Sequence, residues 1–240
     1  MLLPSELGEK YPRLSQEDIF SAIEIAAIRV SKIMLGKTVQ ANVDEDGLHM
    51  YSLDAGDIKE VNLRGIKRII DRPLLDEIES ELMLRDAAVE ALQYKALRGS
   101  VVTGIIDSRK PNGDYVVYIE IAGLTTTMLL ADLPRNQQCD KDYYRGVYDK
   151  GSTLSFHHYS SQVVRSANRA WVRHIVSRTT KDFPCALLQK ITGLSGIKCT
   201  TRKPGEYSEI ISYYRLPKSA INTVGKELKE TLNVKSVKQA

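Results

Sequence analysis

The chain has 240 residues, 42% of them hydrophobic, and a formal net charge of +4 at neutral pH. This length is enough for roughly two or three small domains, and no window approaches the roughly eighteen uncharged apolar residues that would span a membrane. Pro4 and Glu6 interrupt the short apolar run at the amino terminus, so no signal peptide is predicted. We expect a cytoplasmic protein without membrane association.

Charge is distributed unevenly along the chain. Residues 1–96 carry 12 basic and 18 acidic side chains, residues 97–180 carry 11 and 7, and residues 181–240 carry 11 and 5. Clustered Lys and Arg attract phosphate backbones, which acidic segments repel. Residues 1–96 are therefore predicted to bind protein and the remainder nucleic acid.

The first strong element is an amphipathic helix. Ser15 is a suitable N-cap with Asp18 three residues later, and apolar residues at helical spacing from Ile19 to Ile33 predict a single buried stripe. Gly36 is expected to end this helix.

A sheet and a second helix follow. Residues 38–43 and 48–53 predict a hairpin, which gives the first helix a surface to pack against. Residues 58–70 are ambiguous. Pro73 suits the first turn of a long helix that runs to about Leu97.

The middle third predicts a small closed β-barrel. Residues 98–121 have the alternation of a hairpin, with Pro111-Asn112-Gly113 at the turn, and the glycine pair Gly99 and Gly104 would let the first strand bend. Further strands are expected at residues 125–130, 152–159 and 170–177. Five short strands are typical of an OB-type barrel.

The last 60 residues predict a small α/β tail with basic character. Its expected elements are a helix at 182–191, a strand at 208–214, a helix at 220–232 and a strand at 233–237. The fold class is therefore α+β multidomain, with a head at 1–96, a barrel at 97–179 and a tail at 180–240.

Several short strings, taken in order, resemble the NusA family of bacterial transcription elongation factors. They are Leu14 to Glu24 (LSQEDIFSAIE), Gly99 to Gly104 (GSVVTG), Leu133-Pro134-Arg135, Val176-Ser177-Arg178 and Thr201 to Gly205 (TRKPG). The resemblance covers about residues 12 to 215 and is carried by the order of the strings more than by any single one.

This resemblance implies a non-enzymatic factor that modulates pausing, termination or antitermination. NusA-like proteins place the amino-terminal domain on RNA polymerase near the β-subunit flap and the RNA exit channel, which implies polymerase contacts from Glu17, Phe20 and Glu24. They present an S-one-type OB barrel and KH domains to the nascent single-stranded RNA. The tail resembles a shortened KH unit, because KH domains grip nucleotides with a GxxG loop between two helices and we expect no GxxG between Gly193 and Ala240.

Candidate RNA contacts in the barrel are aromatic and basic residues near the first turn. Tyr115 follows the turn and is predicted to stack on a base, with Arg109 and Lys110 close by, although it could instead cap the barrel end. Tyr118 has the opposite strand parity and is predicted to be core.

Three further barrel positions are candidates. Alternation places Phe156 and His158 on one strand face and His157 and Tyr159 on the other, so one pair is expected to be exposed, and Phe156 and His158 are taken as RNA contacts. Arg173 is a phosphate candidate.

Trp171 is predicted to fill the barrel, because it lies in the middle of an apolar closing strand. Lys198, Arg202 and Lys203 lie on a strand and turn of the tail and are RNA candidates. The more carboxy-terminal lysines are expected to form a solvated face.

No catalytic, cofactor or metal motif is present. The sequence lacks a P-loop, a GxSxG elbow, an HExxH helix and a dinucleotide fingerprint, so neither an enzyme nor a small-molecule substrate is predicted. Cys139, Cys185 and Cys199 lack metal-ligand spacing and are expected to be buried thiols. Two alternatives to the polymerase-bound factor stay open: a free RNA-binding protein of translation or decay, and a protein-only interaction module.

Overall fold

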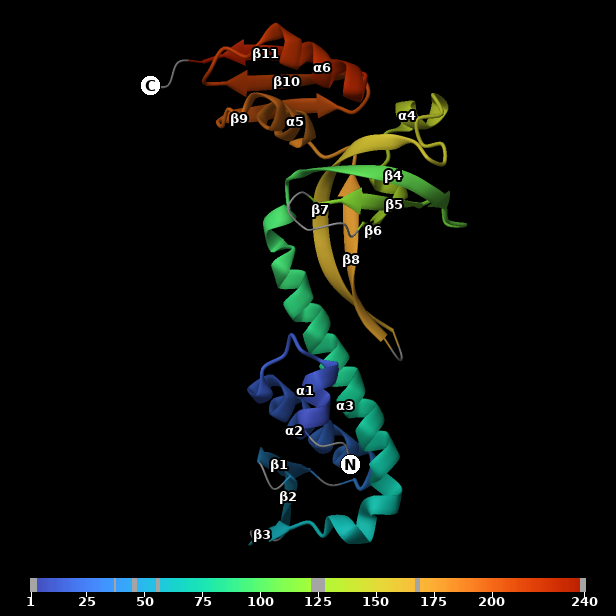
Figure 1. Cartoon of the computed structure of the whole chain (residues 1–240), viewed down its shortest axis with the longest axis vertical. Helices are drawn as coiled ribbons and strands as arrows, with labels where there is room; N and C mark the ends of the chain where they lie inside the picture. Colours follow the sequence, from blue (N-terminus) through green and yellow to red (C-terminus); the bar gives the residue numbers. More distant parts are fainter. Residues whose placement is uncertain are drawn as a thin grey trace. The chain divides into compact units, whose positions relative to one another are not determined.

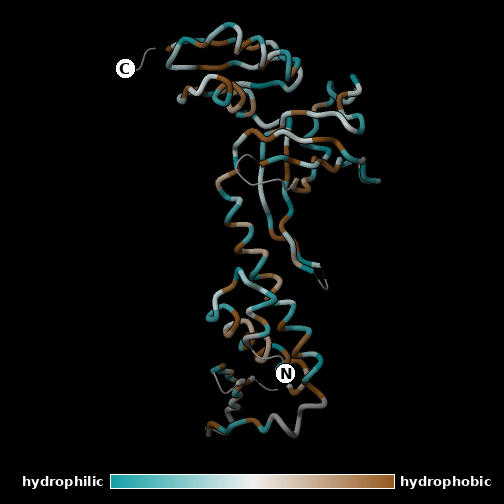
Figure 2. The backbone as a smooth tube through the Cα atoms, viewed as in Figure 1, coloured by the Kyte–Doolittle hydropathy of each residue, from teal (hydrophilic) through white to brown (hydrophobic). Residues whose placement is uncertain are grey.

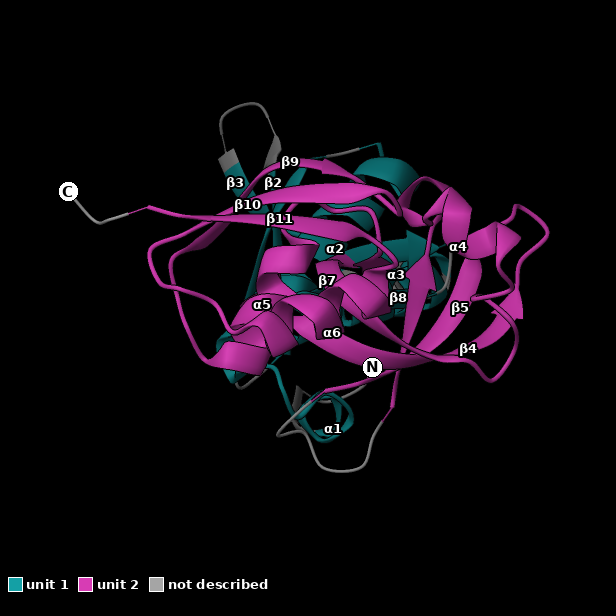
Figure 3. Ribbon diagram, turned by 90° about the horizontal axis from the view of Figure 1, so that it is seen from above, with its two compact units in different colours: residues 1–93, 163–172 teal, residues 94–162, 173–240 magenta. Residues whose placement is uncertain are grey.

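The computed structural model describes residues 4–36, 38–44, 47–54, 57–121, 128–166 and 169–237. The chain divides into two compact units, of which unit 1 comprises residues 1–93 and 163–172 and unit 2 comprises residues 94–162 and 173–240 (Figure 3). The barrel and the tail, which the sequence suggests as separate domains, therefore belong to one unit. Strands β7 and β8 contribute to both units.

Unit 1 combines helices with a three-stranded antiparallel sheet in the order β1-β2-β3 (Figure 1). Its elements are α1 (Pro4–Lys10), α2 (Gln16–Met34), β1 (Val39–Asp44), β2 (Gly47–Asp54), β3 (Asp57–Glu60) and α3 (Leu63–Gln93). The predicted first helix and hairpin are confirmed, and β3 is an additional strand in the segment that the sequence leaves ambiguous.

The amino terminus of α2 has the predicted cap. Ser15 accepts a hydrogen bond from the Asp18 backbone, and the Asp18 carboxylate accepts one from the Ser15 backbone, which forms a capping box. The apolar stripe is buried as far as Val30, whereas Ile33 is 79% exposed. Val30 and Ser31 are the last buried residues of α2, so the prediction that Ile33 is buried is wrong.

Helix α3 begins ten residues before Pro73, which therefore does not lie in the first turn as predicted. Proline costs a helix one hydrogen bond and crowds the preceding turn. Ile70, Leu74, Ile78 and Leu82 recur every fourth residue and are all buried, so packing against the unit 1 core carries the helix through Pro73. The helix ends at Gln93 and a short 3-10 turn, η1 (Lys95–Leu97), follows.

Unit 2 contains a closed five-stranded barrel in the order β4-β5-β6-β8-β7, with β7 also paired to β4 (Figure 1). Its strands are β4 (Val101–Arg109), β5 (Tyr115–Glu120), β6 (Leu129–Leu133), β7 (Thr153–Ser166) and β8 (Arg169–Ser177). The neighbours β6 and β8 are parallel, and the β4–β5, β5–β6 and β4–β7 pairs are antiparallel. The start of the predicted third strand, residues 125–127, lies outside the described residues.

Gly104 explains how β4 fits around this narrow barrel. A Cβ atom at Gly104 would lie 2.6 Å from Cγ1 of Val117 and 3.1 Å from the Phe156 ring. Only glycine leaves room for these core side chains at the point where β4 crosses them.

The tail contains two helices and a three-stranded sheet. Its elements are α5 (Phe183–Thr192), β9 (Ile197–Lys203), β10 (Tyr207–Ser212), α6 (Lys218–Leu228) and β11 (Thr231–Ser236). The sheet order is β11-β10-β9, with β10 and β11 parallel and β9 and β10 antiparallel. Between β6 and β7 lie η2 (Arg135–Gln137) and α4 (Asp140–Tyr144), neither of which the sequence pattern predicts.

Among the described residues, no helix is long and apolar enough to cross a membrane. Figure 2 shows why: hydrophobic and hydrophilic residues alternate along the described helices and strands. All three cysteines, Cys139, Cys185 and Cys199, are free and buried, as predicted.

Candidate functional site

The outer surface of β5 and β6 carries an exposed aromatic platform. Along β5 and β6, Val117, Ile119, Ala131 and Leu133 point into the barrel core, which leaves the alternate positions outside. Tyr118 and Leu130 lie opposite each other in the strand register and are 40% and 55% exposed. An exposed ring on a sheet of this kind can stack on a nucleotide base.

Asp132, two residues after Leu130 on β6, positions two cations. Asp132 Oδ1 lies 2.6 Å from Nζ of Lys110, and Asp132 Oδ2 lies 2.6 Å from Nε of Arg173. Asp132 is buried, whereas both cations remain more than a third exposed. The cluster therefore keeps one net positive charge beside the platform, and we call Tyr118, Leu130, Lys110, Asp132 and Arg173 the barrel face.

The β4–β5 turn adds a second basic and aromatic group next to the barrel face. The guanidinium carbon of Arg109 lies 5.7 Å from the Tyr115 ring centroid and 5.2 Å from that of Tyr143, and Arg109 also donates to the Tyr143 hydroxyl. Tyr143 and Tyr144 of α4 are both exposed. Arg109 is thus held at the surface, where it stays exposed.

The predicted roles of Tyr115 and Tyr118 are reversed. Tyr115 is only 7% exposed and packs against Tyr148 inside the barrel, with ring centroids 5.2 Å apart. A ring enclosed in this way has no free face for a base, so the stacking role proposed for Tyr115 is wrong. The two tyrosines do lie on opposite faces of β5, as predicted. Tyr115, however, lies on the inward face, together with Val117 and Ile119.

Phe156 and His158 are also unsuitable as RNA contacts, because both are fully buried. Phe156 belongs to the barrel core. His157, between them, packs near Phe183 of α5, with ring centroids 6.0 Å apart. The tail covers the outer side of β7 here, so three successive residues are buried and strand alternation no longer predicts exposure. Only Tyr159 of the alternative pair is exposed.

The buried histidines contribute no positive charge near neutral pH. Burial, reinforced by His174 and His157, lowers the pKa of His158 to about 4. Burial also lowers the pKa values of His157 and His174. Ser161 contacts both His158 and His174, with Oγ 3.3 Å from Nε2 of His158 and 3.0 Å from Nδ1 of His174.

Trp171 is 44% exposed, so the prediction that it fills the barrel is wrong. Phe156 and Val176 occupy the interior instead. Trp171 belongs to the segment of β8 that is part of unit 1.

Of the three predicted RNA contacts in the tail, the one at Arg202 is wrong, because this residue is buried. Its side chain is 2% exposed, lies 2.7 Å from Oε1 of Glu230 and donates to the backbone oxygens of Thr180 and Arg178. Arg202 therefore fastens the tail and has no free donor edge for a phosphate. Lys198 is exposed, and Lys203 is exposed but pairs with Glu206.

The tail does contain one GxxG sequence, Gly193 to Gly196, so the expectation that none occurs there is wrong. It joins α5 to strand β9, so it does not lie between two helices as the KH nucleotide-gripping loop does. Helix α6 leads directly into β11 through Lys229 and Glu230.

The predicted polymerase contacts in unit 1 differ in accessibility. Glu17 is exposed, Phe20 is partly buried against the unit 1 core, and the Glu24 carboxylate accepts a hydrogen bond from the Val43 backbone. Glu17 is thus the most available of the three for a partner.

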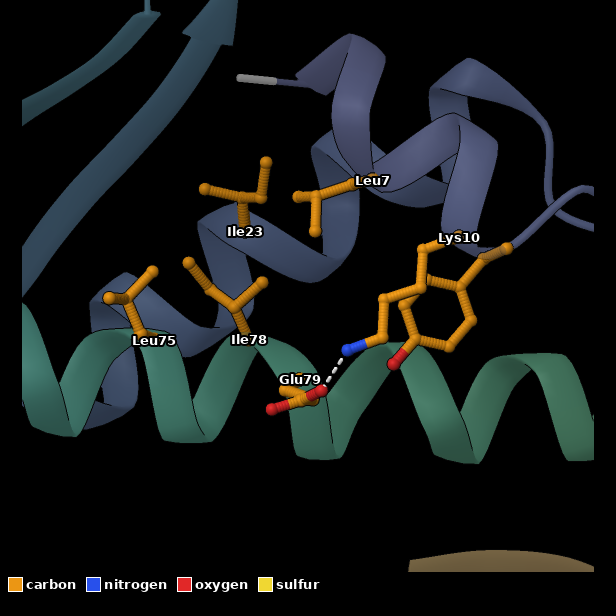
Figure 4. Close-up of a pocket in the computed structure, with 7 residues that line it drawn as sticks. Leu7, Lys10, Ile23, Leu75, Ile78 and Glu79 are labelled. Carbon is orange, nitrogen blue, oxygen red and sulfur yellow. Dashed lines mark hydrogen bonds and ion pairs between the residues drawn. The ribbon is translucent and has the colours of Figure 1, made fainter. Parts of the chain in front are cut away.

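A small apolar pocket lies between α1, α2 and α3 (Figure 4). Leu7, Ile23 and Ile78 line it, and the Lys10–Glu79 ion pair closes one edge. Its volume of about 90 Å³ is well below the roughly 300 Å³ at which small-molecule sites begin. The pocket therefore does not fit a cofactor.

No group of three or more potential metal ligands occurs among the residues that the structure describes. Tyr118, Leu130, Asp132 and Tyr143 are the site residues that the sequence interpretation missed. A polar Asp132 within the apolar run of β6 was the available signal, because a buried carboxylate needs cationic partners.

Comparison with known protein families finds no matching family, and comparison with curated proteins finds no matching relative.

Proposed function

We propose that this protein is a non-enzymatic, NusA-like transcription factor that binds single-stranded RNA on the barrel face and RNA polymerase through unit 1. The observation that carries the proposal is the exposed Tyr118–Leu130 platform beside the cluster of Lys110, Asp132 and Arg173. Stacking and phosphate contacts from such a surface bind RNA with little sequence preference.

The barrel topology supports the same proposal. The order β4-β5-β6-β8-β7, counted within the barrel as strands 1-2-3-5-4, closes through the first and fourth strands. This is the connectivity of an OB-type barrel, in which the face of strands 2 and 3 and the loop between strands 1 and 2 bind oligonucleotides. The barrel face lies on β5 and β6, and Arg109 and Lys110 lie at the β4–β5 turn.

The tail supports a KH-like assignment less strongly. Its mixed three-stranded sheet with two helices resembles a KH unit that has lost one helix, and the GxxG loop is not between helices. We therefore assign the main RNA affinity to the barrel face. The acidic composition of residues 1–96 and the exposure of Glu17 support polymerase docking by unit 1.

The test is RNA binding by the full chain with and without Tyr118. Tyr118→Ala should weaken binding to an unstructured oligonucleotide by about 1 to 3 kcal/mol, because it removes one stacked base. Tyr214→Ala, which removes an exposed tyrosine from the tail, is the matched control and should leave affinity unchanged. Fluorescence anisotropy at several salt concentrations measures both.

Salt dependence gives an independent readout of the two cations. Replacing Lys110 and Arg173 with alanine should reduce the slope of log affinity against log salt by about 0.7 for each lost phosphate contact. If affinity is insensitive both to Tyr118→Ala and to salt, the barrel face does not bind RNA, and the protein-only interaction module is favoured instead.

A further inference from the structure

Unit 2 contains a cleft between the barrel and the tail, and none of the barrel face residues lines it. Arg98 and Tyr159 line it from the barrel side, and Thr180, Lys181 and Lys198 line it from the tail side. Its volume is about 450 Å³, which lies within the roughly 300 to 1,000 Å³ of small-molecule sites. It could hold one nucleotide but not a folded RNA.

The walls of this cleft are fixed to each other by a buried network. Arg178 follows β8, and its Nε lies 2.7 Å from Oδ2 of Asp142 while its other nitrogens donate to the backbone oxygens of Ser155 and Glu227. Arg202 donates to the backbone oxygen of Arg178 and pairs with Glu230. Buried charges with several partners hold one geometry, so the cleft is preformed and does not depend on a loose gap between two parts.

The charge of the cleft is strongly positive and unpaired. Arg98, Lys181 and Lys198 are all exposed, and none has an ion pair or side-chain hydrogen bond among the described residues. The barrel-face cations Lys110 and Arg173, in contrast, share Asp132. Asp182 is the single carboxylate that lines the cleft, so three cations face one anion.

Groups suited to a base and to a hydroxyl or phosphate oxygen lie in the same cleft. Tyr159 is exposed, and Thr180 Oγ1 is buried without a hydrogen-bond partner among the described residues. Burial lowers the pKa of His157 and raises the pKa of Cys185 to about 12, so both are neutral at physiological pH. Uncompensated cations, an aromatic ring and an unpartnered polar oxygen together match an anion that carries a flat ring.

We propose that this cleft binds the phosphate and base of a single nucleotide, with Arg98, Lys181 and Lys198 on the phosphate and Tyr159 against the base. The nucleotide is either a free nucleoside monophosphate or one residue of an RNA strand. The site is separate from the barrel face and does not require polymerase binding.

Calorimetric titration of the full chain with uridine monophosphate, adenosine monophosphate, inorganic phosphate and a ten-nucleotide RNA tests the site. The double variant Lys181→Ala and Lys198→Ala should lose affinity for the bound species by about tenfold or more, since charge-assisted hydrogen bonds are the strong ones. The double variant Lys218→Ala and Lys226→Ala makes the same charge change on α6, which does not line the cleft, and should bind as the unmodified chain does.

Tyr159 separates base recognition from simple anion binding. Tyr159→Ala should weaken the nucleotide and leave inorganic phosphate unchanged, whereas Tyr159→Phe should retain nucleotide affinity because it keeps the stacking ring. Circular dichroism melting of every variant identifies any loss of folding.

Comparing the titrations with the monophosphates and with the RNA distinguishes the two sources of the nucleotide. Weakened binding of the monophosphates identifies a free ligand, and weakened binding of the RNA alone identifies a strand residue. If neither a monophosphate at up to about 1 mM nor the RNA depends on Lys181 and Lys198, the proposal is overturned. Tyr118→Ala tests the barrel face separately, so the cleft proposal and the proposed function can fail independently of each other.

Discussion

At the scale of single residues, the structure separates cations that can reach a ligand from those that hold the fold. Lys110 and Arg173 are oriented by Asp132 yet remain exposed, whereas Arg202 is enclosed beside Glu230. Sequence alone could identify all of them only as basic residues on strands or near turns. Their roles differ because carboxylates far away in the sequence select which guanidinium or ammonium group is buried.

The buried histidines predict a pH dependence of stability. The pKa of His158 is lowered to about 4 in the folded protein, so protons bind more readily to the unfolded chain, in which a histidine pKa is about 6.5. Stability from this group is complete above about pH 6.5 and is lost as the pH falls toward 4, to an extent of up to about 3 kcal/mol.

Urea unfolding of the full chain between pH 5 and pH 8 measures this effect. His158→Gln should flatten the decline of unfolding free energy below pH 6.5 relative to the unmodified chain. An unchanged decline in His158→Gln would show that other groups are responsible.

At the scale of elements, local patterns predicted the strands and helices well where one physical preference dominated. The Ser15–Asp18 capping box and the hairpin of β1 and β2 follow from local chemistry and are confirmed. The start of α3 was mispredicted because tertiary packing overrides the preference of Pro73 for a first turn.

The barrel face could not be predicted in the same way. Strand periodicity establishes that Tyr115 and Tyr118 lie on opposite faces, but it does not say which face is inside. Val117 and Phe156 pack closely against Gly104, which identifies the inward face. These are contacts between different strands, so the pattern within one strand does not contain them. Burial of His157 depends on the tail, which is still more distant in sequence.

Gly104→Ala tests the barrel core directly. The new methyl group would lie 2.6 Å from Val117 Cγ1, so core residues must shift and stability should fall by roughly 1 to 3 kcal/mol. Gly8→Ala in α1, where the nearest atom is 3.9 Å away, should be neutral or stabilising. Equal unfolding midpoints for the two variants would contradict the assigned packing of β4.

At the scale of the whole molecule, buried ions join the barrel and the tail, which makes unit 2 one packed body. Arg202 contacts Glu230 within the tail and the backbone of the segment that leaves the barrel. Gly205 and Ser208 also donate to Glu230, so the loop after β9 folds inward.

Arg202→Ala should be strongly destabilising, by about 3 to 5 kcal/mol, because it leaves the Glu230 carboxylate buried without its ion pair. Lys203→Ala removes the neighbouring exposed cation and should leave stability nearly unchanged, because solvent screens its pair with Glu206. Chemical denaturation of both variants checks the difference, and comparable losses would show that Arg202 is not the fastening residue.

The central claim is that the barrel face meets the transcript while unit 1 holds the polymerase. Photocrosslinking of 4-thiouridine-labelled nascent RNA in a stalled polymerase complex, followed by peptide mass spectrometry, tests it most directly. The account predicts adducts on peptides that contain Tyr118 or Leu130, with the chain still bound to polymerase after nuclease treatment. A chain that leaves the polymerase when RNA is destroyed, or one whose adducts lie only in unit 1, would contradict it.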